Sequence, residues 1–105
     1  MTKLKRPNEC NSLEEVRGEI DKIDYEIISL FSKRLKYVEE VVNYKNDEEG
    51  VIAAARKNQV ITDRAKRAAS LGLDPIVFQE IYTLLIDRNI QHELELLKVR
   101  TEIKE

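Results

Sequence analysis

Apolar residues recur at steps of three and four along the first part of the chain, the spacing of one face of an α-helix. They are Leu13, Val16, Ile20, Ile23, Ile27, Leu30 or Phe31, Leu35, Val38 and Val41. Ser12 and Glu15 form a capping box at the start of this pattern. No proline or strong turn interrupts it before residues 46–50. The pattern predicts one helix over residues 12–44, about 48 Å long at 1.5 Å per residue.

Two shorter helices follow. A thin stripe of small and apolar residues predicts a helix over residues 54–71, and Gly72 is a natural stop for it. Asp74 as N-cap and Pro75 at the first helical position begin the third helix, which we expect to fray near Thr101. Its apolar stripe comprises Phe78, Ile81, Tyr82, Leu85, Ile86, Ile90, Leu94 and Leu97. The fold class is therefore all-α, with three helices per chain.

The length of the first helix predicts a homodimer. A compact chain of 105 residues has a radius of gyration of about 13 Å, so a 48 Å helix must protrude with its apolar stripe uncovered. A second copy of the chain is the simplest cover, which gives an intertwined helical homodimer. The alternative is a monomeric three-helix bundle with a broken first helix. We expect an N-terminal extension at residues 1–11, a single domain at 12–101 and a tail at 102–105.

The composition of the chain limits the classes of binding partner and the compartment that we expect. Charged residues make up 36% of the chain, but the net charge is only −2, which gives no reason to expect nucleic acid or an anionic membrane. Cys10 is the only cysteine, so no intrachain disulfide can form, and we interpret it as an incidental thiol in a reducing compartment. No apolar segment follows the basic start, and none approaches the ~18 apolar residues of a membrane span. We therefore expect a soluble, cytoplasmic protein.

Three cations on or near the first helix do not fit a solvated face. Arg34 stands where the pattern calls for an apolar residue, and Lys45 follows eleven residues later, about 20° around and about 16 Å along the same face. Two long side chains at that spacing can close on one small anion. Arg17 lies about 25 Å before Arg34, so it can reach such an anion only in the partner's site of an antiparallel dimer.

Two further charges extend this candidate site. Arg56 begins the second helix and could cover it, while Glu93 falls on the apolar stripe of the third helix. Buried ionised groups are costly unless they are paired, so they usually have partners or a function. The structural alternative is that Arg17 and Arg34 extend their charged ends to solvent while Glu93 pairs with one of them.

Other kinds of chemistry are poorly supported. His92 is the only histidine, which excludes a histidine-based zinc cluster and most catalytic triads. The glycines are scattered and form no phosphate-binding loop. Asp21 and Asp24 are typical of a solvated helix face. We expect no metal and no cofactor.

The segment Ser-Leu-Glu-Glu-Val-Arg-Gly-Glu-Ile-Asp-Lys-Ile-Asp at residues 12–24 resembles the start of the all-helical chorismate mutases. Arg34 after Leu30, and then Lys45, continue the similarity, which covers about residues 12–97. The family implies three helices per chain, an interlocked dimer and two equivalent sites for the dianion chorismate. Its Claisen rearrangement to prephenate needs only a compact substrate conformer and charge stabilisation at the breaking C–O bond.

The resemblance also implies roles for single residues. Arg17 of the partner chain would bind one substrate carboxylate and Arg34 the other, with Arg56 adding to this grip. Lys45 would contact a carboxylate and the ether oxygen of the bond that breaks.

Residues on the third helix would complete the site. Glu93 would face the same ether oxygen, where many relatives have Gln, and Asn89 would contact the substrate. We hypothesise that Glu93 must be protonated to donate a hydrogen bond there.

Two features depart from ordinary mutases. Those enzymes carry a Glu that holds the substrate hydroxyl directly after the arginine of the second helix, where this chain has Lys57. The lead-in at residues 7–13 and the loop at 45–53 resemble isochorismate-pyruvate lyase of salicylate synthesis. The composition of residues 46–50 permits a mobile lid. The lyase carries Gln at the Glu93 position. Chorismate mutase is therefore the leading prediction and isochorismate-pyruvate lyase the alternative. A non-catalytic helical dimer or regulatory module is the alternative from another class.

Overall fold

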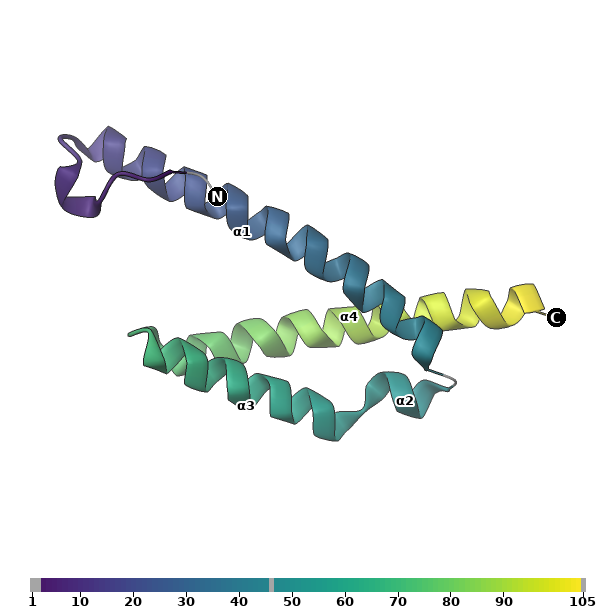
Figure 1. Cartoon of the computed structure of the whole chain (residues 1–105). Coiled ribbons are helices and arrows are strands. Elements are labelled where there is room, and N and C mark those ends of the chain that lie inside the picture. The colour runs from purple at the N-terminus through teal and green to yellow at the C-terminus, as the bar shows by residue number, and fades with distance from the viewer. Residues whose placement is uncertain (1–2, 46, 105) are drawn as a thin grey trace. The chain divides into compact units, whose positions relative to one another are not determined.

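The computed structural model describes residues 3–45 and 47–104. All regular structure within these residues is helical, which confirms the predicted all-α class (Figure 1). The elements are η1 (Pro7–Glu9), α1 (Leu13–Val41), η2 (Val42–Tyr44), α2 (Glu48–Ile52), α3 (Ala54–Ser70) and α4 (Pro75–Lys104), where η marks a short 3-10 helix. The chain divides into two compact units, residues 1–36 and residues 37–105.

The three long helices begin where the sequence predicts them. α1 and η2 together cover residues 13–44, and α3 ends within one residue of the predicted bound. Two details differ. α4 stays helical through Lys104, past the expected fraying at Thr101, because the segment after Leu97 contains no helix breaker. The segment expected as a loop also contains α2, which Asp47 caps by accepting a hydrogen bond from the Gly50 amide. Asn46 lies outside the described residues.

The start of α1 uses the predicted capping residues in a modified way. Ser12 Oγ accepts a hydrogen bond from the Glu15 amide at 3.1 Å, as in a capping box. The Glu15 carboxylate, however, accepts from the amide of Asn11 at 2.7 Å, one residue before the expected donor. The Lys5 amide donates to Glu19 at 3.0 Å. These bonds hold the extension against the first turns of α1, which Figure 1 shows as a segment turning back along the helix.

The same bonds shift two carboxyl pKa values. The hydrogen bond from the Asn11 amide lowers the pKa of Glu15 below its ordinary value. The Lys22 side chain, followed by the Lys5 amide, lowers the pKa of Glu19. Both carboxylates are therefore ionised at neutral pH and hold the extension through charge-assisted hydrogen bonds.

In the unit of residues 37–105, α3 and α4 lie side by side and run in opposite directions (Figure 1). Gly72 makes the turn between them at a φ of 81°, a conformation that favours glycine. Asp74 then caps α4 by accepting from the Ile76 amide at 2.9 Å. The buried apolar side chains of the pair include Val60, Ala65, Ala68 and Ile86, and the two alanines are small enough to let the helices pack closely.

A second apolar cluster joins the start of η2 to α4. Val42 and Leu97 are buried at its centre, with Ile90, Leu94 and Leu96 partly buried around them. α2 also packs against α4. The backbone turns from α2 into α3 at Ala53, whose φ of 33° is unusual for a residue with a side chain. The segment that carries Lys45 is thus fixed to α4 from both sides.

Candidate active site

Lys45 lies directly after η2, where the chain leaves the helix in an extended conformation. Its side chain is half-buried, and its ammonium donates a hydrogen bond to the Gly50 carbonyl oxygen at 2.7 Å. The Gly50 amide in turn donates to the Asp47 carboxylate at 2.8 Å. α2 therefore folds back over Lys45 and orients its charged end.

Gly50 makes this packing possible. A β-carbon at this position would lie 3.3 Å from Lys45 Cδ and 3.3 Å from Asp47 Oδ1, both closer than ordinary van der Waals contact. Glycine at position 50 thus allows the stem of Lys45 to pass close to the backbone of α2. The sequence showed this residue only as one of three scattered glycines.

Arg100 is a residue of the site region that the sequence analysis missed. Its guanidinium donates from one terminal nitrogen to the carbonyl oxygen of Val42 at 2.5 Å and from the other to that of Lys45 at 2.6 Å. A signal was available in the sequence, because seven residues separate Glu93 from Arg100, which places both on nearly the same face of α4. The structure adds that Arg100 on this face reaches the first residue of η2 and the residue that follows it.

Glu93 is the buried charged residue of the described chain, with an exposed fraction of 8%. It lies between Ile86 and Leu97, two buried residues of the α4 stripe. Asn89 is half-buried one turn earlier on the same face, about 6 Å along the helix. Both side chains interact with neighbouring groups. α4 thus presents a carboxyl and an amide next to apolar residues, where polar contacts are strong because water is scarce.

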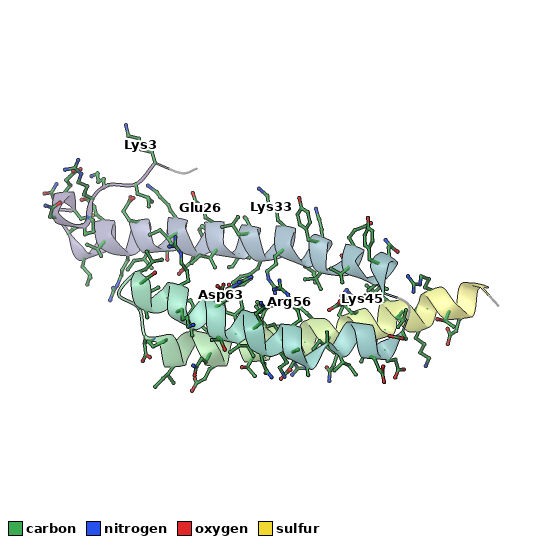
Figure 2. The ribbon with its side chains drawn as sticks, turned by 60° about the horizontal axis from the view of Figure 1, so that its bottom comes forward. Lys3, Glu26, Lys33, Lys45, Arg56 and Asp63 are labelled. Atoms are coloured by element: carbon green, nitrogen blue, oxygen red, sulfur yellow. The ribbon has the colours of Figure 1, made fainter. Side chains whose placement is uncertain are left out.

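Arg56 and Lys57 differ although they are adjacent at the start of α3. Arg56 is exposed, and its guanidinium donates to Gln59 within the same helix, at 3.3 Å. Figure 2 shows Arg56 and Lys45 on the same side of the α3–α4 pair. The Lys57 ammonium is instead bound to the Asp87 carboxylate of α4 at 2.5 Å. Arg56 can therefore turn toward an anion, whereas Lys57 is held in an ion pair between helices.

Arg17 and Arg34 belong to the unit of residues 1–36, where both lie on α1. Arg17 is exposed, and Arg34 is half-buried and interacts with neighbouring groups. Seventeen residues separate them, or about 25 Å of helix. That each shares a site with Lys45 stays a prediction.

A hollow between α2 and the end of α4 is a poor candidate for binding a dianion. Its lining residues are Asp47, Glu48, Leu94, Glu95, Leu97, Lys98, Thr101 and Glu102. Four carboxylates against one ammonium give it the wrong sign for an anionic ligand. Among the described residues, no three His, Cys, Asp or Glu side chains gather into a metal site. None of the helices in this part of the chain is long and apolar enough to span a membrane.

The family model for chorismate mutase type II matches residues 16–94, about three quarters of the chain. The chain belongs to this family. The matched segment of this chorismate mutase family member includes every candidate site residue: Arg17, Arg34, Lys45, Arg56, Asn89 and Glu93. The predicted resemblance is thus confirmed at the level of the family.

This family member is also similar to a protein named isochorismate pyruvate lyase from Pseudomonas aeruginosa. The two are 27% identical over 92 residues, which cover 88% of this chain and 91% of that protein. The family and the relative both support a pericyclic enzyme for chorismate-related substrates. Their names refer to two different reactions, a mutase reaction and a lyase reaction.

Proposed function

We propose that the chain is a pericyclic enzyme for chorismate-type dianions, with the rearrangement of chorismate to prephenate as its first candidate reaction. The observation that carries this proposal is the family match over residues 16–94. It coincides with cations at positions 17, 34, 45 and 56, in a chain whose net charge is −2. A few cations at the family's site positions, in a chain that is acidic overall, indicate a specific binding site for an anion.

In this mechanism the enzyme acts by binding and by electrostatics. Arg34, Arg56 and the partner chain's Arg17 hold the two carboxylates, which keeps the flexible substrate in its compact, reactive conformer. The Lys45 ammonium stabilises the negative charge that develops on the ether oxygen as the C–O bond breaks. Glu93 in its acid form donates a second hydrogen bond to that oxygen. No proton leaves the substrate, and no covalent intermediate forms.

A homodimer is part of this proposal. No α1 residue is buried, and the apolar stripe of α1 includes exposed large side chains: Leu13, Ile20, Ile23, Ile27, Leu30 and Phe31. Exposed apolar area of this kind favours association, because its burial gains about 25 cal/mol per Å². A second copy with α1 antiparallel covers the stripe and brings Arg17 to the partner's site.

The second candidate function is an isochorismate-pyruvate lyase that releases salicylate and pyruvate. Similarity to the Pseudomonas aeruginosa protein favours it. The Lys57–Asp87 ion pair favours it as well. By the resemblance, ordinary mutases have a Glu in place of Lys57, and that Glu holds the substrate hydroxyl. A lysine held by Asp87 cannot supply that carboxylate.

The decisive experiment incubates the purified protein separately with chorismate and with isochorismate, and measures prephenate and salicylate. Prephenate from chorismate supports the mutase, and salicylate from isochorismate supports the lyase. A folded protein that turns over neither substrate would overturn the proposal and favour a non-catalytic helical or regulatory module. Arg34→Ala is the matched control, because it removes a substrate contact without removing a core residue.

A further inference from the structure

Arg100 holds the backbone on either side of the turn that carries Lys45. Its two terminal nitrogens donate to the carbonyl oxygens of Val42 and Lys45, at 2.5 and 2.6 Å. These carbonyls bracket the last turn of η2, in which the Lys45 amide itself donates to Val42 at 3.3 Å. One guanidinium thus fixes both ends of a single turn.

Helix ends leave carbonyl groups without a full set of backbone donors, and Arg100 adds a side-chain donor to the carbonyls of Val42 and Lys45. Water or a local side chain usually satisfies them, and a cation at a helix C-terminus is favourable. Here the donor comes from α4, 58 residues beyond Val42 and 55 beyond Lys45. Arg100 therefore couples the position of Lys45 to the helix that carries Glu93.

Only arginine has the right shape for this contact. Its planar fork spans two acceptors, whereas a lysine ammonium is a single point donor. Arg100 Nε is buried and has no hydrogen-bond partner in the described part of the chain, which is a cost. That cost is consistent with selection for the two terminal contacts. The buried Val42 side chain, packed on Leu97, fixes the same turn from its apolar side.

We infer that Arg100 is a positioning residue for Lys45. Resting on the proposed function, this inference gives Arg100 no contact with substrate. It acts through the Lys45 backbone and so sets where the ammonium starts and how far it reaches. A displacement of a reacting group by about 1 Å can cost about 100-fold in rate.

The first test compares Arg100→Met with Lys98→Met, an exposed charge loss on the same helix. With the reaction that the wild type catalyses, Arg100→Met should lower kcat by about 10- to 100-fold with a smaller change in KM. Arg100→Lys should recover part of the loss, since it can still satisfy one carbonyl. Lys98→Met should leave both constants unchanged. Assays are run well below the thermal midpoint of each variant, so that only folded protein is compared.

A double-mutant cycle with Lys45→Met then separates positioning from a general loss of structure. If Arg100 acts through Lys45, Arg100→Met has little further effect on the residual rate of Lys45→Met. Fully additive losses would overturn the inference, as would unchanged kcat in folded Arg100→Met.

Hydrogen exchange gives a readout that does not depend on activity. Arg100→Met should speed exchange of the Lys45 and Gly50 amides, while the Phe78 amide near the start of α4 stays unchanged. If the wild type turns over neither substrate, the proposed function fails, and exchange alone then decides whether Arg100 holds this turn. Unchanged exchange at Lys45 would overturn the inference.

Discussion

The ammonium of Lys45 is bound to the carbonyl oxygen of Gly50, 2.7 Å away, within one short turn of chain. The contact makes position 50 sensitive to a single methyl group, because a β-carbon there would press on Lys45 Cδ at 3.3 Å. Gly50→Ala should therefore move the Lys45 side chain and lower kcat/KM about 3- to 10-fold without unfolding the protein, which is less than the roughly 100-fold loss that a full 1 Å misplacement can cause. Steady-state kinetics with the active substrate measures this.

Gly18→Ala is the matched control for that substitution. Gly18 lies inside α1, and a β-carbon there meets no atom of its own chain within 4 Å. Alanine should stabilise the helix by about 0.5–1 kcal/mol with kcat/KM unchanged. Equal kinetic losses in the two alanine variants would contradict the role assigned to Gly50.

The positions of the three long helices along the chain were predictable because they rest on local signals. Apolar spacing, the Ser12 cap, Gly72 and the Asp74–Pro75 pair all act within a few residues, and the structure contains the helices that they predict. α2 was not predicted, because five residues are too few for a visible period. The bonds of Arg100 to Val42 and Lys45 join residues more than 50 positions apart, which no local pattern encodes. The sequence therefore identified the charged site residues one by one, whereas the groups that they contact became known only from the structure.

If each active site is built from both chains of the dimer, mixing two inactive variants should restore activity. Arg34→Ala and Arg17→Ala should each abolish most activity while the protein stays folded and dimeric. In a mixed dimer, the chain that retains Arg34 receives Arg17 from its partner, so one of two sites is complete. Random mixing after unfolding and refolding should recover about a quarter of the wild-type rate, because half of the dimers are mixed. No recovery, or a monomer by sedimentation, would contradict the intertwined homodimer.

The Lys57–Asp87 pair predicts a change in substrate preference. Lys57→Glu combined with Asp87→Asn places a carboxylate beside Arg56 without leaving two acids face to face. The double variant should raise prephenate formation relative to salicylate formation, measured as the ratio of the two kcat/KM values. Asp87→Asn alone is the control and should lower stability by less than about 1 kcal/mol, as expected for a partly exposed ion pair. An unchanged ratio would argue against position 57 as the difference between the two reactions.

Glu93 predicts the pH dependence of the reaction. If its acid form donates to the ether oxygen, the rate should fall as pH rises and the carboxylate forms, because a carboxylate can only accept. Glu93→Gln keeps a donor at every pH and should flatten the profile. The measurement is kcat of both proteins at pH values from about 5 to about 9, on either side of neutrality. A profile that stays the same in Glu93→Gln would exclude this role.

The N-terminal extension predicts a local loss of structure in acid. The pKa of Glu15 is lowered by the Asn11 amide and that of Glu19 by Lys22, so protons bind more weakly to the folded segment than to the unfolded one. The stabilisation is complete above the ordinary carboxyl pKa of 4.5 and is lost as the pH falls through the lower folded values.

The protection of the Lys5 and Asn11 amides, the two backbone donors, measured relative to the intrinsic exchange rate at each pH, should therefore fall below pH 4.5 while the α3–α4 core stays protected. Glu15→Gln removes the charge-assisted bond and should accelerate exchange at Asn11 already at neutral pH. Glu14→Gln, an exposed neighbour in the same turn, is the control and should leave Asn11 unchanged. Equal exchange in the wild type and Glu15→Gln at neutral pH would show that the extension is held by other contacts.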